Sequence, residues 1–303
     1  MSINKYKIKK WLKMLSGTSL LYVDQGVGKA FKPGVLCGYF NDLTEKVLKD
    51  PDTLMKGSLP SMQNERGESI VFATTIFQYG LGCYDLLLLD NKEEYLSQFI
   101  KCVDWAVMNQ DSFGGWDVSA FAGIDSRYGA MAQAEGCSLL LRAYVLLNED
   151  LYLERAKKAI DLMLRPIEKG GTALYHGNDL ILLEFTNTSV VLNGWIFSLF
   201  GIYDYYLVTK DHQYFENLQR TLNSLKSRLC DFDTGFWSKY NLNNSIASPF
   251  YHKLHISQLE ALSMIDSDIR WITYKDLFES YQNSKIKRSF AILVKVLQKV
   301  FGE

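Results

Sequence analysis

The sequence predicts an all-α fold, an incomplete (α/α) toroid or barrel of about four helical hairpins with short β-hairpins on one rim. From Glu68 onward, apolar residues recur at helical spacing, and the helices come in pairs. The pairs also repeat: GCYDLLLLDNKEEYL from Gly82 aligns without gaps with GIYDYYLVTKDHQYF from Gly201. Periodic helical hairpins bury their apolar faces only by stacking, so the repeat predicts a closed or nearly closed ring.

Each repeat is expected to form an apolar inner helix, a turn and a more charged outer helix. The tyrosines that mark the register are Tyr95, Tyr152 and Tyr214, separated by 57 (152−95) and 62 (214−152) residues. A final helix is expected from Lys287 to Val300. The expected pairs are Glu68–Leu89 with Lys92–Asn109, Ala130–Leu147 with Leu151–Leu164, Ser189–Val208 with His212–Leu229, and Tyr251–Met264 with Ile272–Asn283.

The loops after the outer helices are rich in glycine and aromatic residues, with GGW at Gly114, GGTALYHGNDLILLEF at Gly170 and DTGFW at Asp233. In a ring these loops gather on one rim, where a rigid scaffold commonly carries its functional residues. Residues 1–67 are irregular and punctuated by Gly and Pro. We therefore divide the chain into an N-terminal segment, 1–67, that packs on the barrel, and a catalytic-type barrel domain, 68–303.

Composition narrows the class of protein. Hydrophobic residues make up 48% of the 303 residues, and the formal net charge is -1, which gives no electrostatic basis for binding nucleic acid. The five cysteines are scattered and show no zinc-site spacing, which favours reduced thiols and a cytoplasmic location. The apolar window Ile70–Leu89 is interrupted by polar residues, so we expect a buried helix and no membrane span. The sequence leaves the oligomeric state open, a homodimer included.

The stretch from Asp233 to Leu262 is the most informative for chemistry. It predicts a tight turn, a short aromatic hairpin with Trp237 and Tyr240, and then a helix that Ser248 caps. The first turn of that helix carries Tyr251, with His252 and His255 close behind. A hydroxyl and two imidazoles at the start of one buried helix predict a site there.

Several blocks of this chain resemble the C-terminal domain of the heparan D-glucuronyl C5-epimerases and their bacterial relatives. They are GGW at Gly114, YGAMAQAEGCSLLLRAY at Tyr128, VLNGWIFSLFGIYDY at Val191, DTGFWSKYNL at Asp233 and YHKLHISQL at Tyr251. GYFNDLTEKV at Gly38 and IFQYGLGCYDLLL at Ile76 are similar to the bacterial members. The resemblance is colinear over nearly the whole chain and implies an (α/α) barrel that acts on uronate sugars.

The resemblance implies three catalytic residues: Glu184, Tyr251 and Tyr240. Two positions depart from the family pattern, because Phe185 stands where the family has a Tyr and Asn243 where it has an Arg. Side chains that we expect to contact the substrate are Tyr128, Gln133, Asn193, Asn243, His252, His255, Trp116 and Trp237.

C5 epimerisation removes a carbon-bound proton beside a carboxylate and returns one from the opposite face. It requires a base and an acid on opposite sides of the sugar ring, and a positive charge for the carboxylate. Glu184 suits the base and Tyr251 the opposite partner, while Lys239 or Arg127 is a candidate for the charge. Proton exchange through an enediolate uses no redox cofactor, and we expect neither a cofactor nor a metal.

Structural interpretations compete with each functional one. Packing also explains Tyr251, Tyr240, Trp116 and Trp237. Structural hydrogen bonds are the commoner role for histidines such as His252 and His255, and capping of a strand edge also explains Glu184. Asp85 and Asp204 occupy equivalent repeat positions and are expected to be structural. Three functions stay open: a uronate C5-epimerase-like enzyme acting on a glycan or its precursor, a polysaccharide lyase on the same scaffold, or a non-catalytic glycan-binding or assembly protein.

Overall fold

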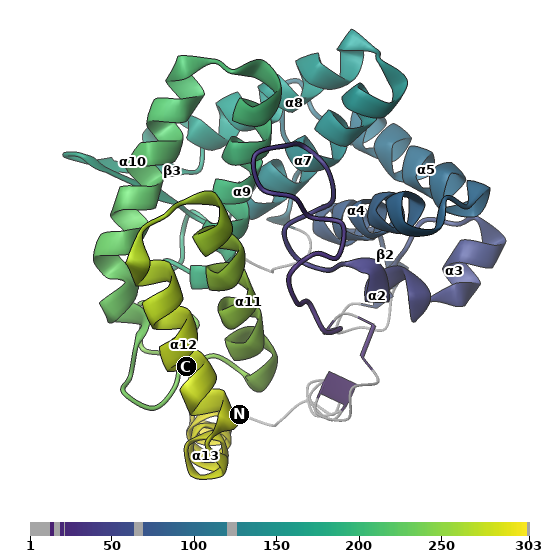
Figure 1. Cartoon of the computed structure of the whole chain (residues 1–303). Coiled ribbons are helices and arrows are strands. Elements are labelled where there is room, and N and C mark those ends of the chain that lie inside the picture. Colours follow the sequence, from purple (N-terminus) through teal and green to yellow (C-terminus); the bar gives the residue numbers. More distant parts are fainter. Residues whose placement is uncertain (1–12, 15–18, 21, 64–68, 120–125, 302–303) are drawn as a thin grey trace.

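Four helical hairpins form most of the molecule (Figure 1). The computed structural model describes residues 13–14, 19–20, 22–63, 69–119 and 126–301. The inner helices are α4 (Ala73–Asp90), α7 (Ala130–Leu147), α9 (Leu192–Thr209) and α11 (Pro249–Ile265). The outer helices are α5 (Glu93–Asn109), α8 (Asp150–Leu164), α10 (His212–Arg228) and α12 (Ile269–Asn283), and α13 (Lys285–Phe301) follows.

The inner helices pack side by side in the order α4, α7, α9 and α11, and each outer helix packs on its own inner partner. The N-terminal segment lies across the open side of this ring. Its helix α2 (Thr44–Leu48) packs on α4, and its Asp24 forms an ion pair of 2.5 Å with Lys253 of α11. The predicted incomplete (α/α) toroid is therefore confirmed, and a segment from another part of the chain bridges its opening.

Burial explains why the two kinds of helix differ in sequence. The outer helix α10 is amphipathic and buries one stripe that includes Tyr214, Leu218 and Leu222. The inner helix α9 is buried on all sides from Leu192 to Tyr205, as a helix at the centre of a ring must be. Its Gly201 permits the close approach to α7, since a Cβ there would lie 2.6 Å from that of Ala134.

The internal repeat is visible in the structure. Tyr95, Tyr152 and Tyr214 are each the third residue of an outer helix, and all three are buried. The turns before α5, α8 and α10 also have a common form, because Asn91, Asn148 and Lys210 follow α4, α7 and α9 with φ near +50°. Asn adopts this left-handed conformation more readily than most residues do.

The strands are short and form two antiparallel pairs, β1 (Met62–Gln63) with β2 (Ser69–Ile70) and β3 (Ala173–His176) with β4 (Asp179–Leu182). The first pair joins residues on both sides of the boundary that we predicted at 67/68. It also shortens the helix expected from Glu68, because α4 begins only at Ala73, after the strand. The segment before it contains the helices α2 and α3 (Pro51–Lys56).

A buried ion pair fixes the N-terminal segment to the ring. The Arg142 guanidinium donates to the Asp204 carboxylate at 2.7 Å and to the backbone carbonyls of Cys37 and Gly38 at 3.0 and 3.1 Å. Asp85 accepts a hydrogen bond from the backbone N–H of Tyr39 at 2.9 Å. Both aspartates are almost fully buried, so their predicted structural role agrees with their contacts.

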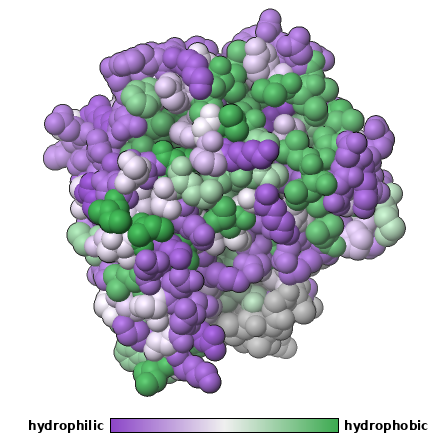
Figure 2. Space-filling model, in the orientation of Figure 1, coloured by the Kyte–Doolittle hydropathy of each residue, from purple (hydrophilic) through white to green (hydrophobic). Residues whose placement is uncertain are grey.

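The surface is mixed in character. In the orientation of Figure 1, hydrophobic residues gather in the upper right part of the face, among hydrophilic ones (Figure 2). Exposed apolar side chains at the ends of the inner helices include Leu88, Leu89, Val145 and Leu146.

The substitution Asp204→Ala should lower the free energy of unfolding by about 3–5 kcal/mol, because it leaves the buried Arg142 charge without its carboxylate. Urea unfolding followed by circular dichroism measures the change. Glu154→Ala is the matched control, since Glu154 pairs with Lys158 on the surface and such exposed pairs contribute little to stability. Equal losses in the two variants would contradict the structural role of Asp204.

Candidate active site

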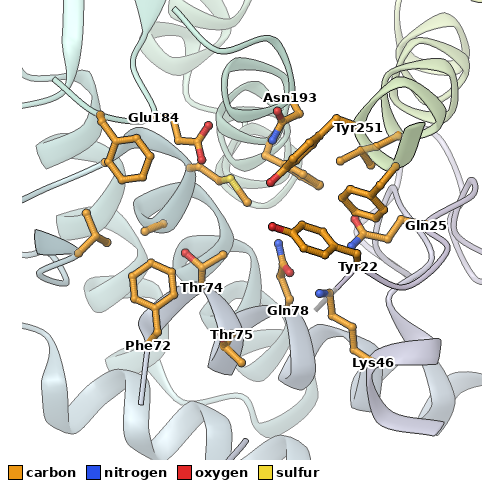
Figure 3. Close-up of a pocket in the computed structure, with 18 of the residues that line it drawn as sticks. Tyr22, Gln25, Lys46, Phe72, Thr74, Thr75, Gln78, Glu184, Asn193 and Tyr251 are labelled. Atoms are coloured by element: carbon orange, nitrogen blue, oxygen red, sulfur yellow. The ribbon is translucent and has the colours of Figure 1, made fainter. Parts of the chain in front are cut away.

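The structure contains a cavity of about 240 Å³ at the N-terminal ends of the inner helices (Figure 3). Each of the four inner helices contributes side chains from its first two turns, and residues 22–46 of the N-terminal segment supply the facing wall. The lining residues are Tyr22, Gln25, Lys46, Met62, Phe72, Thr74, Thr75, Gln78, Val118, Gly129, Met131, Ala132, Glu184, Phe185, Asn193, Phe197, Tyr240, Phe250, Tyr251 and Leu254.

The direction of the helices gives this end of the ring a positive potential. The N-terminal end of a helix carries the positive end of its macrodipole, which favours anions. None of α4, α7 and α9 has a side-chain N-cap, whereas Ser248 caps α11 by accepting from the backbone N–H of Tyr251. The backbone of four helices therefore favours a negatively charged group in the cavity.

Glu184 follows strand β4 and fits between two glycines. A Cβ at Gly194 would lie 2.7 Å from Oε2 of Glu184, and a Cβ at Gly129 would lie 2.1 Å from its backbone carbonyl oxygen. Oε2 is buried and has no hydrogen-bond partner among the described residues. Burial raises the pKa of the Glu184 carboxyl to about 7, so near neutral pH it exists in both protonated and ionised forms.

Tyr251 lies at the centre of a group of phenols. Its hydroxyl is hydrogen-bonded to those of Tyr240 and Tyr22, and its ring centroid lies 4.8 Å from that of Tyr240. Burial, with smaller contributions from both phenols and from Glu184, raises the pKa of Tyr251 well above its ordinary value. Tyr251 is therefore held protonated, as a proton donor must be. In Figure 3 it and Glu184 enter from opposite sides, with Asn193 between them.

Lys46 is a cavity residue that the sequence reasoning missed. It belongs to α2, inside the GYFNDLTEKV block, and Figure 3 shows its side chain reaching towards Gln78 and Tyr22. Burial lowers the pKa of Lys46 to about 8, and the nearby Glu135 carboxyl opposes that shift. Glu135 is fully buried beneath the cavity and accepts a hydrogen bond of 2.8 Å from Gln78. The only earlier indication was the similarity of this block to the bacterial relatives.

Three lining residues present unsatisfied oxygen atoms. Within the described part of the chain, Gln25 Oε1, Glu184 Oε2 and Asn193 Oδ1 are buried and accept no hydrogen bond. Buried polar atoms are normally paired, so such a group marks where ligand donors fit. Acceptors of this kind suit the hydroxyl groups of a sugar.

His252 and His255 lie outside the cavity, contrary to the substrate contact that we expected. Both Nδ1 atoms lie within hydrogen-bonding distance of Ser238 Oγ, at 2.8 and 2.9 Å, and His252 Nε2 lies 3.0 Å from the carbonyl oxygen of Phe278. Burial lowers the pKa of His252 to about 3 and that of His255 well below its ordinary value, so both are neutral. Their role is to hold the hairpin of Tyr240 against helix α11.

The two tryptophans that we expected to contact the substrate, Trp116 and Trp237, are packed in the core. Trp237 is fully buried and stacks on His252 with centroids 3.6 Å apart, so it cannot stack on a sugar. Trp116 is buried against Phe77, and its backbone N–H donates to Gln133 Oε1 at 3.1 Å. Gln133, itself fully buried, holds the GGW loop and does not line the cavity.

Four polar side chains also lie outside the cavity. The hydroxyl of Tyr128 donates to Asp111, and Arg127 pairs with the same carboxylate at 2.9 Å. Asn243 is exposed in the hairpin loop, and Lys239 does not line the cavity. Of the residues predicted for the site, the cavity therefore receives Glu184, Tyr240, Tyr251 and Asn193.

Within residues 13–14, 19–20, 22–63, 69–119 and 126–301, no cluster of three or more His, Cys, Asp or Glu side chains is placed to bind a metal ion. No helix in these ranges is long and apolar enough to cross a membrane.

Comparison with known proteins identifies the family. The model of the D-glucuronyl C5-epimerase C-terminus matches residues 110–280, which is more than half of the chain. The chain belongs to this family. A D-glucuronyl C5-epimerase of Caenorhabditis elegans is 29% identical to this chain over 223 residues. The alignment covers 62% of this chain and 36% of that protein. An uncharacterized protein of Methanocaldococcus jannaschii is 30% identical over 137 residues, 43% of this chain and 44% of that protein.

This chain thus spans less than half of the length of each of these two relatives. Among solved structures, the GH76A α-1,6-mannanase of Salegentibacter sp. HEL1_6 matches with a TM-score of 0.47 and 15% identity, over 70% of this chain and 62% of that chain. The unsaturated glucuronyl hydrolase of Bacillus sp. GL1 matches with a TM-score of 0.48 and 14% identity, over 79% and 66%.

The substitution Glu184→Gln should stabilise the protein at pH 8 by up to about 3–4 kcal/mol and should have a much smaller effect at pH 4. The folded-state pKa of Glu184 is about 7, above the value of about 4.3 in an unfolded chain, so ionising this carboxyl costs more in the folded state. Stability is thus lost as pH rises through this window, and Gln avoids the loss.

Urea unfolding at the two pH values tests this prediction, with the exposed Glu149→Gln as control. The control should change the free energy of unfolding little at either pH. A Glu184→Gln variant that is no more stable than the parent at pH 8 would show that the carboxyl is not held in an unfavourable environment.

Proposed function

We propose that this chain is a uronic-acid C5-epimerase-like enzyme that acts on a glycan or glycan precursor. The observation that carries the proposal is the convergence of a carboxyl with a pKa of about 7, a protonated phenol and an ammonium group on one cavity. These are the three groups that proton exchange beside a carboxylate requires. Membership of the epimerase family supports the same reaction.

Glu184 is the base in this proposal. Its ionised carboxylate takes the proton from C5, and the electron pair of the broken C–H bond moves into the sugar carboxylate to give an enediolate. The near-neutral pKa of Glu184 places its proton affinity close to the operating pH, where general-base catalysis is most effective. Asn193 and Gln25 accept hydrogen bonds from ring hydroxyls and so fix the ring orientation.

Tyr251 is the acid on the opposite face. Its hydroxyl proton passes to C5, the enediolate electron pair forms the new C–H bond, and the negative charge remains on Tyr251 as a phenolate. Solvent returns a proton to Tyr251 and removes one from Glu184. Lys46 and the positive ends of the inner helices stabilise the negative charge that develops on the sugar carboxylate.

Incubation of a glucuronate-containing glycan in D₂O should place deuterium at C5 without chain cleavage, measured by nuclear magnetic resonance. The variant Tyr251→Phe should lower the exchange rate by about 10²–10⁴-fold and leave glycan affinity nearly unchanged, because it removes one hydroxyl and little volume. Tyr144→Phe, outside the cavity on α7, is the matched control.

Other outcomes identify the competing functions. A product with the ultraviolet absorbance of a 4,5-unsaturated uronate would identify a lyase, in which the same first proton abstraction is followed by loss of the 4-O substituent. Glycan binding with neither exchange nor cleavage would identify a non-catalytic binding protein. Either result contradicts the proposed epimerase activity.

The pH dependence of kcat/KM should be a narrow bell with its maximum between about 7 and 8. Activity requires ionised Glu184, whose pKa is about 7, and protonated Lys46, whose pKa is about 8. Lys46→Arg should move the descending limb to higher pH, because the guanidinium stays charged. Lys46→Met should weaken binding of the uronate far more than binding of the matching neutral sugar. A descending limb that is unmoved in Lys46→Arg would show that Lys46 does not supply the charge that activity requires.

A further inference from the structure

The last helix, α13, presents an apolar stripe to solvent. Six large apolar side chains on it are between 41% and 83% exposed: Ile286, Phe290, Leu293, Val296, Leu297 and Val300. Their spacing of three and four residues places them along one face of the helix. The opposite face anchors the helix to the protein, since Ala291 is buried, Lys295 donates to Ser245 Oγ at 2.8 Å and Gln298 donates to the carbonyl oxygen of Asn244.

The charge of α13 is of one sign. Lys285–Phe301 contains five basic residues and no acidic one: Lys285, Lys287, Arg288, Lys295 and Lys299. Lys285, Arg288 and Lys299 are exposed beside the apolar stripe. Residues 1–13 of the sequence contain five further lysines and no acidic residue.

The rest of the chain has the opposite charge. Ten of the 33 Lys and Arg residues lie in 1–13 and 285–303, which contain one of the 34 acidic residues, so residues 14–284 have 23 basic and 33 acidic residues and a net charge of -10. The near-zero charge of the whole chain therefore results from two basic ends and an acidic middle. Such segregation favours an anionic partner at the ends.

The charge and the apolar stripe of α13 indicate which kind of partner binds its exposed face. A second copy of α13 would bring its exposed Lys285, Arg288 and Lys299 close to the same three positive charges of the first copy, which disfavours self-association through this helix. A strongly amphipathic helix with a basic flank and a wide apolar stripe is typical of helices that lie in the interface of an anionic bilayer. Its apolar residues enter the acyl boundary while its Lys and Arg side chains contact acidic headgroups.

We propose that α13 docks the protein on an anionic lipid surface, with Ile286, Phe290, Leu293, Leu297 and Val300 inserted into the headgroup boundary. Docking through this helix brings the cavity close to the membrane. Lys299, in the last turn, lies near Tyr22 of the cavity wall, and its charge opposes the burial that raises the pKa of that phenol. A glycan carried on a membrane lipid would then be presented to the cavity edge.

Sedimentation with vesicles tests the proposal on the full chain. The protein should bind vesicles of phosphatidylcholine mixed with phosphatidylglycerol, bind phosphatidylcholine alone much more weakly, and lose affinity as salt concentration rises. The double variant Leu293→Ser/Leu297→Ser should weaken the binding by about tenfold or more, because it removes two inserted apolar side chains. Both leucines are about half exposed in the free protein, so folding should be preserved, and circular dichroism checks this.

The matched control is Leu88→Ser/Leu89→Ser at the end of α4, where the two leucines are 43% and 46% exposed beside the acidic Asp90, Glu93 and Glu94. This variant should bind the anionic vesicles like the parent. Failure of the parent to bind anionic vesicles at low salt would overturn the proposal, as would equal binding by both double variants. So would a solution dimer, detected by light scattering, that only Leu293→Ser/Leu297→Ser dissociates. These measurements use no sugar substrate and therefore do not depend on the proposed epimerase activity.

Discussion

The enclosure of the Glu184 carboxyl is the constraint on which the rest of the site depends. A carboxylate in water has a low proton affinity and is a poor base for a carbon acid. Here Gly129 and Gly194 leave room for the Glu184 backbone and carboxyl, and no described side chain bonds its Oε2 atom. The loss of hydration raises the proton affinity of the group, and the free energy for this comes from the surrounding packed helices.

A separate set of contacts, which does not involve Glu184, positions Tyr251 in the same cavity. The neutral Ser238, His252 and His255 cluster ties the hairpin of Tyr240 to helix α11, and this fixes the two phenols against each other. Histidines are often expected to act on substrates, but here burial keeps both uncharged. The imidazoles therefore position the hairpin and helix, while the hydroxyls that they hold in place line the cavity.

Much of the fold could be predicted from local pattern, because helical periodicity and the repeat of Tyr95, Tyr152 and Tyr214 reflect stacking that recurs along the chain. The convergence of Glu184 with Tyr251 was implied by family resemblance, and residue spacing alone would not have given it. For Trp237 and His252 the sequence left packing and substrate contact open, since the stacking of two rings is decided by three-dimensional packing. Lys46 was missed for a related reason, because it lies 138 residues before Glu184 in the sequence and only the bridging of the ring brings it to the same cavity.

Two parts of the sequence form the cavity wall, and only one of them lies within the region that the family model matches. Glu184, Asn193, Tyr240 and Tyr251 lie within the region shared with the family, whereas Tyr22, Gln25, Lys46 and Gln78 lie before residue 110. Eight of the twenty lining residues lie before residue 110, so mutations there can reshape part of the cavity wall without changing the part that contains Glu184 and Tyr251. Proteins that share residues 110–280 of this family can therefore differ in the shape of the cavity through a segment that the matched region does not include.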